Sequence, residues 1–356
     1  AVLLTARRSA ATPSGLRLAA AGASAGSRRG LSPGSARPRA PHARTGWLVA
    51  AALLCAAPAA AGDPPWRGTT ISYQNTVSAY ELDKSNSQTW NPYYAMGVQG
   101  TLNWFWLDRL YTRASIGLTR ELTEADAETR DGETWWSDLT LTVGTSGWEV
   151  PVLGTRLGAD VTFTLPTSKI SQAQSLQFGT SPAVSIAQPF KLLSGLTLSY
   201  RGVVRINSHE WTTSQRENTR LPSCRGIECA EGLHTGVRNV QWQHAHTGSV
   251  ALAVLDWLSL SAQVGVVEQH LYPRADAEGI TLEAVSNTDT RYLAVWGGEL
   301  TVSPLSMLEI GLGLSTMNPQ LAPDSTSYDP FYNRYSQLYL DLRLDVARLL
   351  GPLGEG

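Results

Sequence analysis

The residues from Tyr335 to Leu349 alternate in hydropathy, with a large aliphatic side chain at every second position. These aliphatic residues are Leu338, Leu340, Leu342, Leu344 and Val346. Successive side chains of a β-strand point to opposite faces, so a strand here has one apolar face and one polar face. A soluble sheet can carry the same pattern with its apolar side on a core. Recurrence of the pattern at membrane-spanning length distinguishes the two cases.

The alternation recurs along most of the chain. It predicts about twelve strands, each near the length that a tilted membrane strand needs. The expected strands are 69–82, 93–105, 110–122, 135–147, 154–168, 175–190, 195–211, 240–256, 258–273, 290–304, 307–321 and 335–349. Short and long connections take turns between them, which a secreted β-sandwich or propeller would not explain. The sequence therefore predicts an all-β fold, a closed antiparallel up-and-down transmembrane β-barrel with short periplasmic turns and longer extracellular loops.

Tryptophans lie beside both kinds of connection. The expected interfacial aromatics are Trp104, Trp106, Trp148 and Trp257 beside short turns, and Trp90, Trp135, Trp136, Trp211 and Trp242 beside long loops. Tryptophan is enriched at both membrane–water interfaces. The distribution supports strands that cross a membrane, with membrane lipid and lipopolysaccharide as the expected partners of the outer face.

The N-terminal region differs in composition from the rest. Residues 1–44 are rich in Arg, Ala, Ser and Pro, and we expect a disordered or mis-annotated extension there. Residues 45–61 read TGWLVAAALLCAAPAAA, in which a basic flank, a short apolar core and small residues predict a signal peptide. The barrel domain is then 62–356. This domain holds every acidic residue of the chain, which argues against binding to nucleic acid.

Two cysteines, Cys224 and Cys229, lie in the polar segment SCRGIEC. No histidine stands near them at the spacing of a zinc site. In an exported protein a local disulfide is favoured over free thiols. The rest of the chain shows no motif for a metal or a cofactor, so neither is expected.

From about Thr69 to Leu349 the chain resembles bacterial outer-membrane β-barrel proteins as a class. The matching features are LVAAALL (48–54), YLDLRLDV (339–346) and the recurring RASIGL (113–118), SAQVGV (261–266) and EIGLGL (309–314). The resemblance implies a location in the bacterial outer membrane. It also implies, as in porins, passage of small solutes through the lumen.

The polar faces of the expected strands predict a charged lumen. The basic candidates are Arg113, Arg156, Arg201 and Arg205, and the acidic candidates are Glu299, Glu309, Asp341 and Asp345. In a closed sheet of twelve strands these two sets lie across from each other, and Asp138, Asp160, Arg291 and Arg343 interrupt the segregation. Opposed charges would select small polar or zwitterionic solutes at a constriction. Alternatively, the charges pair and plug the barrel.

Two functions remain open at this point. One is an outer-membrane channel for passive or selective passage of small polar solutes. The other is a non-conducting surface barrel that acts as a scaffold, adhesin or subunit of a cell-envelope assembly, with the 212–239 loop as its contact for envelope-protein partners. An enzyme is not expected, because His244 and His246 face the apolar side of their strand while Ser249 faces the other side.

Overall fold

The computed structural model describes residues 64–79, 93–123, 132–216, 233–273, 289–322 and 325–350, and the statements below concern these residues. Its strands are β1 Thr70–Ser78, β2 Tyr94–Phe105, β3 Leu110–Glu121, β4 Thr134–Trp136, β5 Leu139–Glu149, β6 Arg156–Leu165, β7 Leu176–Phe190, β8 Gly195–His209, β9 Thr213–Arg216, β10 Leu233–Arg238, β11 Val240–Leu255, β12 Leu258–Leu271, β13 Thr290–Leu305, β14 Leu308–Pro319 and β15 Gln337–Asp345. Two short helices are α3 Lys169–Ala173 and α4 Val346–Leu350. Within the described ranges, no helix is both long enough and apolar enough to cross a membrane.

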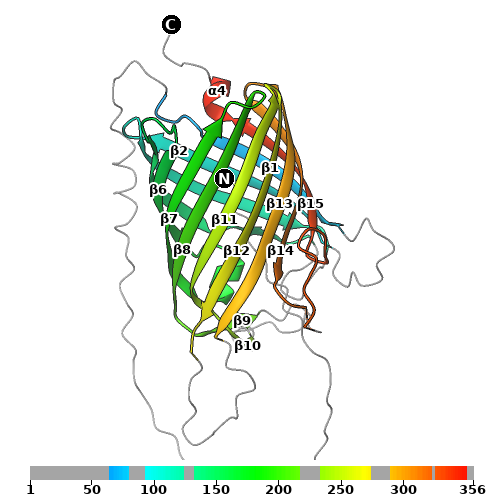
Figure 1. The fold of residues 1–356 in the computed structure, drawn as a ribbon. Helices are drawn as coiled ribbons and strands as arrows, with labels where there is room; N and C mark the ends of the chain where they lie inside the picture. The colour runs from blue at the N-terminus through cyan, green and yellow to red at the C-terminus, as the bar shows by residue number, and fades with distance from the viewer. Residues whose placement is uncertain are drawn as a thin grey trace, which may run out of the picture. The chain divides into compact units, whose positions relative to one another are not determined.

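The strands close into an antiparallel barrel of 12 strands (Figure 1). Each barrel strand pairs with its neighbour along the chain, and β1 pairs with β15 to close the ring. The segments β4 and β5 both pair with β3 and together form one wall position. A separate hairpin is formed by β9 and β10, which lie outside the main sheet. The prediction of a closed, up-and-down antiparallel β-barrel is confirmed.

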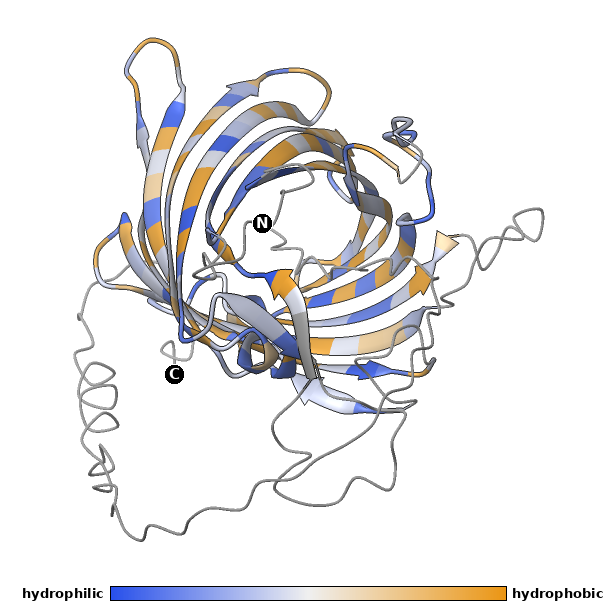
Figure 2. Ribbon diagram, turned by 90° about the horizontal axis from the view of Figure 1, so that it is seen from below, coloured by the Kyte–Doolittle hydropathy of each residue, from blue (hydrophilic) through white to orange (hydrophobic). Residues whose placement is uncertain are grey.

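Strand register separates the two faces of the sheet. Leu338 and Leu340 of β15 stand opposite Leu314 and Leu312 of β14, whereas the intervening Tyr339 stands opposite Gly313. The aliphatic rows are widely exposed on the outer face, with Leu312 at 56% and Val264 at 63% relative accessibility. The view along the barrel shows hydrophobic and hydrophilic residues alternating along the strands (Figure 2). An outer face of this kind requires hydrocarbon around it, because in water its aliphatic rows would stay exposed to solvent.

The interior of the barrel is polar. Asn103, Thr142 and Thr162 are buried on the inward face, where the hydroxyl groups of Thr142 and Thr162 form a hydrogen bond of 2.9 Å. The inward side chains satisfy one another across neighbouring strands, as buried polar groups must. Within the part of the chain that the structure describes, the barrel therefore has no apolar core of the kind found in a soluble sandwich.

Apart from small shifts of the boundaries, the strands differ from expectation in three places. The fourth expected strand is divided at Asp138, whose carboxylate accepts hydrogen bonds from the Ser168 N–H and the Ser171 hydroxyl in the connection that contains α3. The last strand ends at Asp345, because that carboxylate accepts the Arg348 N–H and begins helix α4. Val346, expected on the lipid face of a strand, is therefore the first residue of a helix. Strands β9 and β10 lie within the expected 212–239 loop.

Most of the tryptophans expected at the interfaces lie in two groups near the ends of the strands, whereas Trp296 lies in the middle of β13. Trp136, Trp211 and Trp242 lie near the long loops, while Trp148 and Trp257 lie near short turns, and all five are exposed. Trp104 and Trp106 are half-buried and meet edge to face beside another short turn.

The placement of Trp135 is a correction. It was expected at the interface, yet it is only 9% exposed and pairs with Thr119 of the inward face. The neighbouring Trp136 takes the outward position instead, because two successive strand residues cannot share a face. Trp90, Cys224 and Cys229 lie outside the described residues.

Candidate functional site

The basic side of the lumen centres on an ion pair between β8 and β6. Arg201 donates its two terminal guanidinium nitrogens to the two carboxylate oxygens of Asp160, both at 2.8 Å. Asp160 is almost buried, whereas Arg201 stays 38% exposed. Paired, coplanar contacts of this kind fix the orientation of both groups. The arginine therefore presents one face of its guanidinium to the lumen.

Two further arginines lie along the same wall. The Arg113 Nε donates to the side-chain oxygen of Asn103 at 2.7 Å, and its guanidinium lies 5.2 Å from the Tyr111 ring centroid. The Arg205 Nε donates to the side-chain oxygen of Asn207 at 2.8 Å. Both partners are neutral, so both arginines keep their positive charge uncompensated by these contacts.

Arg156 lies apart from this group. It is exposed at the first position of β6 and stands opposite Glu149 of β5. This position is at the end of the barrel that carries short turns. Three of the four basic candidates therefore lie along one wall, on β3 and β8, and Arg156 lies at its rim.

The acidic side of the lumen lies on β13, β14 and β15. Arg343 donates to Asp341 at 2.6 Å and to Glu309 at 3.0 Å, so one cation is shared between two carboxylates. Glu299 accepts the Tyr339 hydroxyl at 2.8 Å and the Thr301 hydroxyl at 2.8 Å. The carboxylates of this group outnumber its single arginine. Asp345, the fourth acidic candidate, lies at the end of β15 and caps α4.

The two groups lie on opposite sides of the ring. Six strand positions separate β6 from β14 in either direction around the closed sheet. The three ion pairs described above each join residues of one side, Arg201 with Asp160, Arg343 with Glu309, and Arg343 with Asp341. The ion pairs therefore form within each wall. The basic wall keeps a net positive charge, and the acidic wall keeps a net negative charge.

Glycines allow luminal side chains to lie flat against the wall. A Cβ atom added at Gly313 would clash with the Tyr339 ring, which crosses that glycine on its way to Glu299. A Cβ at Gly144 would lie 2.7 Å from the Asp160 Cβ and 2.8 Å from the Tyr111 hydroxyl. In both places the absent side chain creates the space that its neighbour fills.

One cluster was missed by sequence analysis because its members come from two strands. His244 of β11 stands opposite Glu268 of β12, and Trp242 stands opposite His270. The alternation within 258–273 alone would have placed Glu268 and His270 on the same outward face as Val264 and Val266. The register of the two strands then brings these polar groups beside His244.

Comparisons with known proteins give structural neighbours only. No family model matches the chain, and no curated protein matches it. An outer membrane channel from Pseudomonas putida F1 is similar, at a TM-score of 0.48 and 12% identity over 81% of this chain and 99% of that one. The NanC porin follows at 0.40 and 8%, over 78% and 98%. The outer membrane phospholipase of Salmonella typhi gives 0.34 and 10%, over 82% and 95%.

Proposed function

We propose that this protein is a channel of the bacterial outer membrane that passes small polar solutes. The observation that carries the proposal is the arrangement of charge inside the closed ring. Arg113, Arg201 and Arg205 lie on one side, and Glu299, Glu309 and Asp341 lie on the other. A transverse field between such walls orders the dipoles of solutes and of water at a constriction. Zwitterions, which carry both charges, complement it best.

The flat packing of side chains supports a conducting lumen. Tyr339 and Tyr111 would narrow the barrel if they pointed along its radius, yet each lies over a glycine of the wall. Asp160 and Asp341 are likewise held against the wall by Arg201 and Arg343. A barrel of this size is narrow, so the direction of a few large side chains decides whether water can pass.

Conductance in planar lipid bilayers tests the proposal. The full chain is purified from membranes in detergent, its folded state is checked by heat-modifiable migration on gels, and single insertion events are recorded. We expect discrete, stable current steps with a reproducible unit conductance. Folded protein that inserts and stays silent would contradict the proposal and would favour the non-conducting surface barrel.

Liposome swelling gives the solute class. Vesicles that contain the protein are diluted into isotonic solutions of a neutral sugar, a zwitterionic amino acid, or a singly charged ion of similar size. Faster swelling with the zwitterion than with the sugar supports the opposed walls as the selective element. Equal rates for all three solutes would contradict this selectivity while leaving a non-selective channel.

A further inference from the structure

We propose that the outward face of β11 and β12 holds one divalent transition-metal ion of the Zn²⁺ class, ligated by His244, Glu268 and His270. The remaining outward residues of β12 are Leu258, Leu260, Ala262, Val264 and Val266. A carboxylate between two imidazoles is thus an exception on an otherwise apolar, lipid-facing row. Polar groups on that face are costly.

The distances fit a metal centre. The His244 Nε2 lies 3.1 Å from one oxygen of Glu268, and the His270 Nε2 lies 3.0 Å from the other. The ligand atoms of the three residues lie within 4.8 Å of one another. Zinc bonds of about 2.0–2.1 Å at tetrahedral angles place neighbouring ligand atoms roughly 3.3 Å apart. Small rotations of the two imidazoles would therefore close the site.

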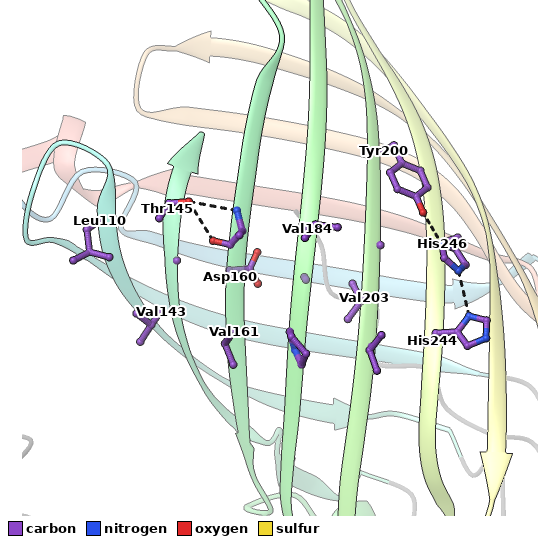
Figure 3. A pocket seen from close by; sticks show the side chains of 16 residues that line it. Leu110, Val143, Thr145, Asp160, Val161, Val184, Tyr200, Val203, His244 and His246 are labelled. Atoms are coloured by element: carbon purple, nitrogen blue, oxygen red, sulfur yellow. Dashed lines mark hydrogen bonds between the residues drawn. The ribbon is translucent and has the colours of Figure 1, made fainter. Parts of the chain in front are cut away.

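The hydrogen bonds around His244 indicate which nitrogen is free. Its Nδ1 lies 3.2 Å from the His246 Nε2, and the His246 Nδ1 lies 2.6 Å from the Tyr200 hydroxyl (Figure 3). When the Nδ1 of each histidine donates along this chain, the His244 Nε2 carries a lone pair. That lone pair then faces a carboxylate oxygen, and the two repel unless a cation lies between them.

His270 points to the same conclusion. Its Nε2 is shielded from solvent and makes no hydrogen bond of acceptable geometry, although a Glu268 oxygen is nearby. Its ring lies parallel to that of Trp242, with centroids 3.7 Å apart and an interplanar angle of 7°. Stacking fixes the direction of the imidazole. In metal sites the ligating histidines are oriented in this way by their surroundings.

The site lies near the end of the barrel that carries the long loops. Glu268 and His270 are within a few residues of the end of β12 at Leu271, and His244 is close to the start of β11 at Val240. His244 and His246 also border an apolar groove of about 640 Å³ lined by Val143, Val161, Pro182, Val184 and Val204 (Figure 3). Three protein ligands leave at least one coordination position open. That position would face the headgroup region of the membrane.

Metal binding by the purified, tag-free full chain tests the proposal. The protein is stripped with a chelator, and Zn²⁺ is titrated against a fluorescent zinc indicator. Wild type is expected to bind one equivalent of Zn²⁺. Glu268→Gln and His244→Ala should each lower the Zn²⁺ affinity more than about 100-fold, and His246→Ala should lower it about 10–100-fold. Substituting Co²⁺ should give visible absorption bands of a low-symmetry site, and these bands should disappear in Glu268→Gln.

Two matched controls isolate the site. Glu309→Gln removes a luminal carboxylate, and His209→Ala removes a histidine at the end of β8 that shares the inward face of Arg205 and Asn207, opposite to the face of the site. Both should retain the wild-type equivalent, and every variant is first shown to be folded by heat-modifiable gel migration. Equal Zn²⁺ affinity in wild type and Glu268→Gln would overturn the proposal. So would the absence of a stoichiometric equivalent in wild type, since a shared proton would then hold the cluster together.

Discussion

The guanidinium of Arg201 and the carboxylate of Asp160 meet through two parallel hydrogen bonds, although β8 and β6 are not adjacent strands. β7 lies between them, and its residues at this height are the small Ala183 and Ser185. The long Arg201 side chain therefore reaches over β7 along the inner surface to the Asp160 carboxylate. The Arg201–Asp160 ion pair therefore holds both charged groups in fixed positions on this wall.

Replacing Asp160 with Asn should make the channel more selective for anions. Arg201 would lose its charged partner and keep its position on the wall. One uncompensated charge at about 6 Å changes the energy of a monovalent ion by roughly 0.7 kcal/mol in a water-like medium. The change lowers the energy of an anion and raises that of a cation, so the anion-to-cation permeability ratio should rise about tenfold. Reversal potentials in a salt gradient measure this ratio. Glu210→Gln, near the end of the barrel, serves as the control. An unchanged permeability ratio in Asp160→Asn would show that Arg201 does not line the conducting path.

Replacing Arg343 with Gln should shift selectivity in the opposite direction. The substitution leaves Asp341 and Glu309 without the cation that they share. Two carboxylates then face the lumen, and the cation permeability should rise by a similar or larger factor. The same reversal-potential measurement applies. A shift toward anions would show that these carboxylates do not face the conducting path.

Replacing Gly313 with Ala should lower the conductance. The new Cβ would occupy the space of the Tyr339 ring, so the ring must move toward the lumen and lose its hydrogen bond to Glu299. Gly248→Ala is the matched control, because the nearest atom to a Cβ there is the Val264 carbonyl oxygen at 4.0 Å. Single-channel recording should show smaller steps for Gly313→Ala only. Equal steps in the two variants would contradict the flat packing of Tyr339.

The loop before β15 should loosen when Asp329 loses its charge. Its carboxylate accepts the Phe331 N–H at 2.8 Å and the Tyr332 N–H at 3.1 Å, and these hydrogen bonds lower its pKa. A lowered pKa in the folded loop means that its ionised form stabilises the loop at neutral pH. This contribution is present above the unfolded pKa of about 3.9 and is lost as the pH falls through the lower folded value.

Hydrogen exchange measures this effect. The Phe331 and Tyr332 amides should exchange faster in Asp329→Ala than in wild type at neutral pH. As the pH falls below about 5 and through the folded pKa of Asp329, the protection of these two amides in wild type should decrease to the level of the variant. If both proteins showed the same protection at neutral pH, the carboxylate would have no role in ordering this loop.

The strands were predictable because each one carries its own pattern. Leu338, Leu340 and Leu342 alternate with Tyr339 and Asp341 within a few residues, so parity alone assigns their faces. Where strands end depends on contacts far along the chain. Asp138 divides its strand by accepting hydrogen bonds from Ser168 and Ser171, about 30 residues away. No local pattern contains that information.

For the functional candidates too, the local pattern predicted the face of the sheet but not the partner of each side chain. Parity placed Arg201 and Arg343 toward the lumen, but it could not show that Arg201 reaches Asp160 across an intervening strand. It placed His244 outward, while the pairing of His244 with Glu268 required the register between β11 and β12. Trp135 and Trp136 show the limit most simply, since both were expected at the interface and only Trp136 faces outward.

The central claim is that hydrocarbon surrounds the aliphatic rows and water fills the polar side, and spin-label accessibility along β12 tests it most directly. Single nitroxide labels are placed in turn from Leu260 to Val264 in a background whose three native cysteines are replaced by serine, and the protein is reconstituted in lipid. Collisions with oxygen, which concentrates in hydrocarbon, should peak at Leu260, Ala262 and Val264. Collisions with a water-soluble nickel complex should peak at positions 261 and 263. A reversed alternation, or an equal response to both reagents along the strand, would contradict the claim.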